Sequence, residues 1–213
     1  MTASFVAFGL GAASWGVFEY LIHRFLGHRP KGRDPFAVEH RAHHSKGDYF
    51  APTRKKALAA TPVILGMFAL FSLVLGPEIG APVAGGLLVT YLSYEWLHLR
   101  LHTHPAKNAY GRWARRHHFY HHFGDPRMNH GLTTPIGDFL FGTHHRPAKI
   151  RVPERLAMVW LVDPSTGDVR KELRDEYELQ RLPGQRTSDI KTSSYVPSSG
   201  SDSATKSEPS RAI

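Results

Sequence analysis

The sequence predicts an all-α fold in which integral membrane helices support a cytoplasmic, histidine-rich helical cap. Three observations lead to this prediction: apolar segments of membrane length, the distribution of lysine and arginine, and a repeated histidine spacing. The chain has 213 residues, 41% of them hydrophobic, which suits one domain. We expect that domain to cover residues 1–182. Residues 183–213 are rich in Ser, Thr, Gly and Pro with few apolar residues, so we expect a disordered C-terminal tail.

Three apolar segments, at about residues 3–22, 57–76 and 80–97, are the predicted membrane spans. Each is close to the roughly 20 residues that a helix needs to cross a bilayer. A cleaved signal peptide is the alternative for the first segment, but it has no basic start and no small-residue cleavage site. Buried core helices of a soluble protein are the alternative for all three.

The basic residues predict the orientation of these spans. The chain has a net charge of +9, and its 27 Lys and Arg residues follow the first and third spans. None precedes the first span or lies in the Gly-Pro-Glu-Ile-Gly connection between the second and third. Positively charged loops stay in the cytoplasm, so both basic segments, and all 15 histidines within them, are predicted to be cytoplasmic. Topology and anionic lipid therefore explain the charge, and we expect no nucleic-acid partner.

The histidines follow one spacing twice. In RRHHFYHHF, three histidines stand at i, i+3 and i+4, which places them on one helical face, and HRAHH repeats that spacing upstream. Each cluster follows a looser pair, at i and i+5 in HRFLGH and at i and i+4 in HLRLH. The i, i+5 pair does not share an α-helical face, so we expect the helix to end near Gly27. The ten histidines are His23, His28, His40, His43, His44, His98, His102, His118, His121 and His122.

This set predicts a dimetal site. Neutral imidazole suits Fe, Zn, Cu and Ni, and one six-coordinate metal cannot use ten side chains and still bind a reactant. Two metals with about five imidazoles each leave an open position for oxygen or water. The chain has no cysteine, which excludes iron–sulfur clusters and thiolate-ligated haem. It also lacks the HExxH motif, and Glu95-Trp-Leu-His98 is its one Glu-x-x-His element of the ferritin type.

Several polar residues are candidates to orient the metal-bound rings. Asn129 and Asp138 lie in NHGLTTPIGDFLFGT, and Glu19 and Glu95 lie near span ends. The alternative roles are turn and cap residues for the first two and helix-end solvation for the glutamates.

Two segments beyond these motifs have local signals. The short apolar run Leu156–Val162 is expected on the membrane surface, and the charged run Arg170–Arg181 favours a helix.

The motifs EYLIHRFLGH, EHRAHH, EWLHLRLH and HFYHH, followed by NHGLTTPIGDFLFGT, resemble the fatty acid hydroxylase/sterol desaturase superfamily of integral membrane di-iron oxidoreductases. The resemblance runs from about Glu19 to Thr143. It implies two iron ions on the ten histidines, with zinc as a substitute and O2 as co-substrate. It also implies hydroxylation of a membrane lipid, either a fatty acyl or a sterol-like one.

Some features depart from that superfamily. Many members have four spans, and eukaryotic fatty acid 2-hydroxylases often carry a fused haem domain with a His-Pro-Gly-Gly signature. The nearest string here is His104-Pro-Ala-Lys, so we expect a separate electron donor: a reductase, a ferredoxin or a cytochrome-like protein. Carotenoid hydroxylation and lipid desaturation on the same site are the alternatives.

An alternative from another class is a non-enzymatic membrane metal transporter or sensor. Transporters usually place ionisable residues within their spans, and the second span has none. The sequence leaves open the lipid, the carbon attacked, the donor, the division of ligands between the metals and the oligomeric state.

Overall fold

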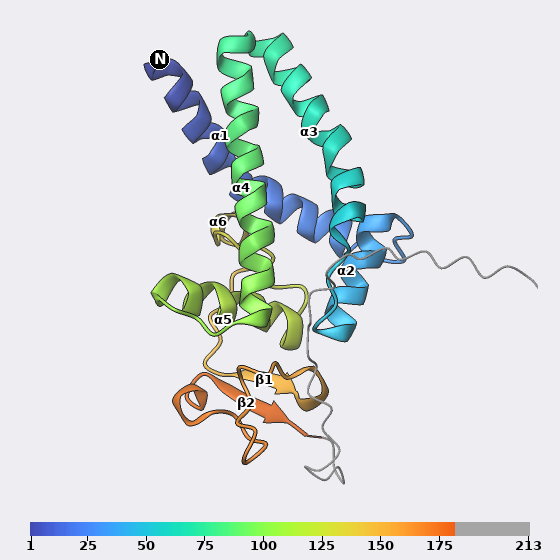
Figure 1. The fold of residues 1–213 in the computed structure, drawn as a ribbon, viewed down its shortest axis with the longest axis vertical. Coiled ribbons are helices and arrows are strands. Elements are labelled where there is room, and N and C mark those ends of the chain that lie inside the picture. Colours follow the sequence, from blue (N-terminus) through green and yellow to red (C-terminus); the bar gives the residue numbers. More distant parts are fainter. Residues whose placement is uncertain (182–213) are drawn as a thin grey trace, which may run out of the picture.

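The computed structural model describes residues 1–181, so the predicted tail at 183–213 lies outside the described residues. Figure 1 shows three levels along the long axis of the molecule. The long helices α1 (Thr2–Leu21), α3 (Thr53–Leu75) and α4 (Pro77–Thr103) form one end. Helices α2 (Pro35–Lys46) and α5 (Ala109–Phe123) lie below them, and a small sheet forms the other end.

Helices α1 and α4 pack closely because glycines face the partner backbone. A Cβ atom at Gly11 would lie 2.0 Å from the carbonyl oxygen of Val83, and one at Gly86 would lie 2.1 Å from that of Phe8. Any larger side chain at either position would push the helices apart. Small residues at helix crossings are typical of membrane helices, where close backbone approach stabilises association.

Helix α3 returns antiparallel to α4 and has no buried residue. Large apolar side chains such as Leu65, Leu70 and Leu73 are exposed along it. By length and composition, two helices of the described chain could cross a membrane: Thr2–Gly27 and Thr53–Leu75. Helix α4, which contains the predicted third span, is an unbroken helix of 27 residues but is not among those two.

N-capping residues fix where α2 and α5, the two histidine-bearing helices below the long helices, begin. The carboxylate of Asp34 accepts a hydrogen bond from the backbone N–H of Ala37 at 2.9 Å, and Pro35 follows as the first residue of α2. The amide oxygen of Asn108 accepts from the N–H of Gly111 at 2.8 Å at the start of α5. Such caps satisfy N–H groups that lack an intrahelical partner, and so fix the register of each histidine cluster.

The end of the described chain differs from the all-α prediction. Strands β1 (Ile150–Pro153) and β2 (Tyr177–Gln180) pair in parallel, and the short helices η2 (Glu154–Leu156) and η3 (Lys171–Leu173) lie between them in sequence. The fold is therefore mostly helical rather than all-α.

Two local expectations were wrong here. Most of the run Leu156–Val162 belongs to a buried core with Phe119 of α5, and within it only Val159 is exposed. The segment Arg170–Arg181 contains β2 rather than a longer helix, because its Tyr177 is buried in the same core and pairs with Ile150.

Candidate metal centre

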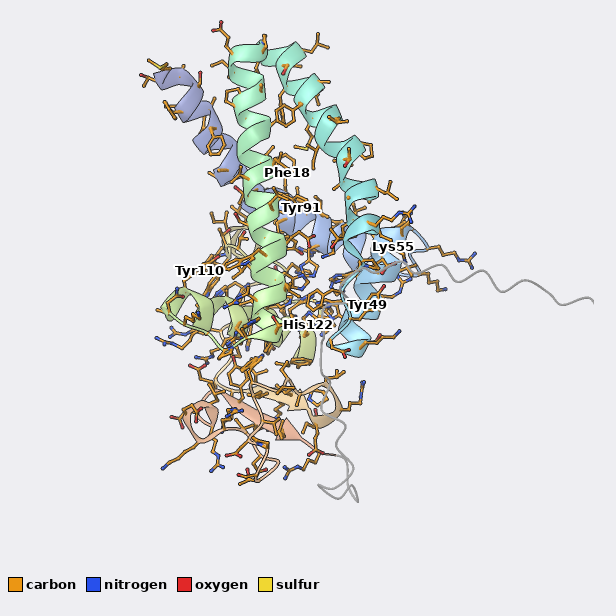
Figure 2. The ribbon with its side chains drawn as sticks, in the orientation of Figure 1. Phe18, Tyr49, Lys55, Tyr91, Tyr110 and His122 are labelled. Carbon is orange, nitrogen blue, oxygen red and sulfur yellow. The ribbon has the colours of Figure 1, made fainter. Side chains whose placement is uncertain are left out.

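The ten histidines lie together in the cap, in two groups of five. Within each group the candidate ligand atoms all lie within 4.8 Å of one another. The first histidine group contains His23, His28, His40, His44 and His121. The second histidine group contains His43, His98, His102, His118 and His122. Figure 2 shows the level of His122, where the lower end of α4 approaches α2 and α5.

A π-helical turn brings the i, i+5 pair of the first group together. The segment η1 (Ile22–Gly27) continues α1 with wider turns, and the N–H of His28 donates to the carbonyl of His23 at 3.2 Å. The two ring centroids lie 5.2 Å apart. The helix ends near Gly27 as expected, but the pair does share a face because the turn is wider by one residue. π-helical turns are rare in proteins, and those that do occur are often found at functional sites.

The Nε2 atoms of the first group face one another. His28 Nε2 lies 2.9 Å from His121 Nε2 and 2.9 Å from His40 Nε2. His40 Nε2 lies 3.2 Å from His23 Nε2, and His44 Nε2 lies 3.2 Å from His121 Nε2. Three separate segments of the chain, η1 with its following residue, α2 and α5, therefore direct the same ring atom to one point.

The second group repeats this arrangement with α4 in place of η1. The Nε2 atoms of His98 and His43 lie 2.8 Å apart, and those of His102 and His118 lie 3.0 Å apart. Among the described histidines of the two groups, His122 has both ring nitrogens buried without a hydrogen-bond partner. Buried polar atoms are nearly always satisfied, and a cation bound at one nitrogen of His122 would supply a partner that no protein group provides.

Backbone carbonyls hold three of the rings from behind. The Nδ1–H groups of His43 and His121 donate to the carbonyls of Tyr49 and Met128, at 2.7 and 2.8 Å. The Nδ1–H of His23 donates to the carbonyl of His130. A proton on Nδ1 leaves a lone pair on Nε2, which is the tautomer that a metal binds.

The donor set fits a pair of cations. In the first group, His28 Nε2 lies 2.9 Å from the Nε2 atoms of both His40 and His121, and one Nε2–H cannot be directed at two ring nitrogens at once. A cation among these atoms would coordinate all of their lone pairs. All-imidazole donor sets suit divalent transition metals such as iron and zinc.

The rings are also held in the neutral, metal-binding form. Burial lowers the pKa of His28 and of His43 to about 4, and that of His44 to about 2. Burial, reinforced by neighbouring imidazoles, lowers the pKa of His118, His121 and His122 well below the usual value. Protons therefore do not compete for these nitrogens at neutral pH.

Asp138 and Asn129, predicted to orient the rings, act on the loop behind the first group. Asp138 accepts from the N–H of His130 at 2.8 Å and from Nε2–H of His117 at 3.0 Å. Burial alone would raise the pKa of this carboxyl, but hydrogen bonds from His117, His130 and Thr143 keep it well below its usual range. Asp138 therefore supports the carbonyl that holds His23, one step away from the ring.

Asn129 lies between the two carbonyls that hold His121 and His23. Its backbone adopts a left-handed conformation with φ of 57°. Its amide accepts from the N–H of His145 at 2.7 Å and donates to the carbonyl of the same residue at 2.9 Å. This residue thereby sets the turn that directs the carbonyls of Met128 and His130 toward the first group.

The two glutamates named from the sequence lie elsewhere. Glu95 pairs with Lys56, which comes from the start of α3. Glu19 is buried and accepts hydrogen bonds from the backbone of Leu132 and Thr133. Glu95 therefore joins α3 to α4, whereas Glu19 joins α1 to the loop that Asp138 holds.

The five remaining histidines lie outside both groups. His117 is buried against Asp138, and His104 contacts Thr103 at the end of α4. The rings of His144 and His145 stack on Phe139 and Tyr120, respectively. The ring of His130 packs edge-on against Tyr20 and beside the first group.

The sequence did not predict the supporting carbonyls, because a backbone oxygen carries no residue signal. It also did not predict the link from Trp160, whose Nε1–H donates to the carbonyl of His102 at 2.8 Å. The available signal was an aromatic residue, Trp160, within an apolar run, and that signal does not identify a hydrogen-bond partner.

Comparison with known proteins is consistent with this geometry. Residues 8–143 match the family model described as fatty acid hydroxylase. The fatty acid 2-hydroxylase of Homo sapiens is 34% identical over 148 residues, which cover 64% of this chain and 38% of that protein. The ceramide very long chain fatty acid hydroxylase scs7 of Schizosaccharomyces pombe is 31% identical, covering 64% of this chain and 41% of that protein. The chain therefore spans about two fifths of the length of these relatives.

A solved structure of full-length scs7p, in which only the hydroxylase domain is visible, superimposes with a TM-score of 0.55 at 26% identity. The match covers 69% of this chain and 58% of that one. The family model accounts for well over half of the chain and includes all ten histidines. This chain belongs to the fatty acid hydroxylase family.

Proposed function

We propose that the protein is a membrane-bound, O2-dependent lipid hydroxylase that holds two iron ions, one in each histidine group. Its substrate is a fatty acyl chain, free or within a ceramide-type lipid. One observation carries this proposal: in each of the two histidine groups, five imidazole rings bring a ring nitrogen within 4.8 Å of one another. The substrate class is supported by relatives named fatty acid 2-hydroxylase, ceramide very long chain fatty acid hydroxylase and dihydroceramide fatty acyl 2-hydroxylase.

When bound, two iron ions supply the O2 chemistry that imidazole and carboxylate side chains cannot perform alone. The balanced reaction inserts one oxygen atom of O2 into a C–H bond. The second oxygen atom leaves as water, with two electrons and two protons from a donor.

The residues of the chain place the histidine groups where a lipid can reach them and exclude water from the second group. His23 directly follows α1, and His98 lies in the continuous helix α4 below its apolar part. The two groups therefore lie next to the ends of the apolar helices, where an acyl chain can reach them from a bilayer. Phe50 packs against His43 and His98, with ring centroids 4.9 and 5.4 Å apart, and so gives the second group an apolar wall.

The proposed orientation places the cap on the cytoplasmic side. The supporting observation is the distribution of Lys and Arg, which cluster in the segments that carry the histidines. A separate cytoplasmic electron donor, a reductase, ferredoxin or cytochrome-like protein, supplies the electrons.

The test is lipid mass spectrometry of membranes that contain the wild-type protein, iron, a competent reductant and O2. Hydroxylation predicts a mass gain of about 16 Da, or about 18 Da with labelled oxygen, as an open metal site that uses O2 requires. Fragmentation then locates the hydroxyl on the acyl chain. The His43→Ala/His121→Ala double variant, inserted to the same level, is the inactive control.

The alternatives give other results. Loss of two hydrogens without added oxygen would indicate a desaturase on the same site, and oxygen gain confined to carotenoids would indicate a carotenoid hydroxylase. Unchanged acyl, sterol and carotenoid pools would contradict an enzyme and favour a metal transporter or sensor.

A further inference from the structure

A compact apolar surface surrounds the short helix α6 (Ile136–Leu140). We call it the α6 patch: Phe25, Ile136, Phe139, Leu140 and Phe141, each between 45% and 68% exposed. In Figure 1, α6 lies above α5, at the height of the lower half of α4. These are large apolar side chains from two separate segments, and contiguous apolar surface of this kind marks an interaction site.

The patch is fixed to the end of a predicted span. Gly137 packs so tightly on Tyr20, near the end of α1, that a Cβ atom would lie 2.3 Å from the tyrosine ring. The rings of Tyr20 and Phe141 stack with centroids 4.9 Å apart. The α6 patch is therefore held rigidly at the end of the apolar helix α1.

A cation lies within the patch. The guanidinium of Arg24 lies 5.3 Å from the ring centroid of Phe25 and 6.0 Å from that of Phe141. It also donates a hydrogen bond to the hydroxyl of Tyr20. Arginine and tyrosine beside apolar side chains are typical of the membrane–water boundary, where their apolar parts are buried and their polar ends reach headgroups.

We propose that the α6 patch inserts into the headgroup–acyl boundary of the bilayer that α1 and α3 cross. The partner is the lipid surface itself, because the patch is fixed to the end of the apolar helix α1 and carries a cation that matches lipid phosphate. Interfacial apolar surfaces of this size penetrate by about 5–10 Å. The inference rests on the membrane part of the proposed function and not on the reaction.

The opposite face of α6 links the patch to the first histidine group. Asp138 points inward from α6 and holds the N–H groups of His130 and Gly131, each at 2.8 Å. The carbonyl of His130 in turn holds the ring of His23. Lipid contact on one face of α6 therefore sets the depth of the histidine groups relative to the bilayer.

Single cysteine labels test the proposal, because the chain has no cysteine of its own. The Phe139→Cys and Leu140→Cys variants are each labelled with an environment-sensitive fluorophore and reconstituted in phosphatidylcholine/phosphatidylglycerol vesicles. Two quenchers are compared: lipids with a nitroxide at a shallow acyl position, and aqueous iodide. Leu70→Cys on the exposed face of α3 reports on the bilayer interior, and Asp175→Cys, exposed near β2, reports on water. Metal content equal to wild type confirms that each variant is folded.

We expect the shallow nitroxide lipid to lower emission at positions 139 and 140 by about half, and iodide to lower it by less than a tenth, as for an interfacial segment. Iodide quenching equal to that at position 175 would overturn the proposal. Protection from both quenchers would also overturn it, and disulfide-linked dimers of the same variants before labelling would then assign the patch to a second copy of the chain. If the label at position 70 is also quenched only by iodide, α3 does not lie in the bilayer and the membrane part of the proposed function is wrong. If position 70 is protected from iodide, only the proposal for the α6 patch is wrong.

Discussion

The imidazole rings of His44 and His122 stack face to face, with centroids 4.0 Å apart and an interplanar angle of 3°. His44 comes from α2 and belongs to the first histidine group, whereas His122 comes from α5 and belongs to the second. The two groups thus share a wall of two parallel rings. Both helices also carry rings of both groups, so a shift of either helix moves rings of both, and the two candidate metal positions are mechanically coupled.

Metal content tests the two groups separately. We expect about two metal ions per wild-type chain, as the paired open sites require. His121→Ala removes a ligand from the first group and His43→Ala one from the second, so each variant should lose at least one ion while still inserting in membranes. Elemental mass spectrometry of the purified protein measures the content. His104→Ala, outside both groups, is the control, and an equal loss in this variant would contradict the assignment. Zinc found in place of iron would not, because imidazole sites bind it well.

Asp138→Asn tests the support of the first group. The carboxylate accepts hydrogen bonds from two backbone N–H groups and from Thr143 and His117. An amide has one acceptor oxygen and would direct N–H groups at other donors, so we expect a loss of about 2–4 kcal/mol of unfolding free energy. Thermal unfolding in detergent and metal content measure the effect. Asp175→Asn, on the exposed surface, should change neither, and an unchanged Asp138→Asn variant would refute the role.

Two substitutions of Asn129 distinguish the contribution of its backbone conformation from that of its side-chain amide. Asn129→Gly keeps the left-handed backbone accessible but removes the amide, whereas Asn129→Ala removes the amide and adds strain of about 1–2 kcal/mol. We therefore expect the unfolding temperature to fall in the order wild type, glycine variant, alanine variant. Metal loss should follow the same order. An alanine variant as stable as the glycine variant would show that the conformation of this residue does not matter.

The contact between α1 and α4 is tested by two glycines on the same helix. Gly11 contacts the backbone of Val83, whereas a Cβ at Gly9 would meet nothing within 4 Å. Gly11→Ala should lower the unfolding temperature, since overpacking costs about 1–3 kcal/mol. Gly9→Ala should be neutral or slightly stabilising, since alanine favours helices. Equal behaviour of the two variants would contradict the close contact.

The sequence predicted which histidines would gather, because helical periodicity alone places i, i+3 and i+4 on one face. It could not divide them between the groups. His43 and His44 are neighbours in sequence but belong to different groups, as do His121 and His122. Adjacent residues on a helix point about 100° apart, so each helix serves both groups, and only the positions of the other helices show which ring joins which.

Contacts between residues far apart in the sequence explain the remaining differences between the predictions and the structure. The carbonyl that holds His23 belongs to His130, 107 residues later, and spacing within a motif cannot reveal such a partner. The apolar residues of Leu156–Val162 predict a segment on the membrane surface, yet most of them share a buried core with Phe119. Membrane orientation, the identity of the metals and the electron donor stay predictions.

The position of α5 in the chain has a consequence for biosynthesis. Both histidine groups include rings from α5, and the last of them is His122. A chain emerging from the ribosome folds from its N-terminus, so α1, α3 and α4 are made before either group can be complete. Neither histidine group can therefore be completed until α5 has been made, and α1, α3 and α4 cannot depend on a completed metal site while they are synthesised.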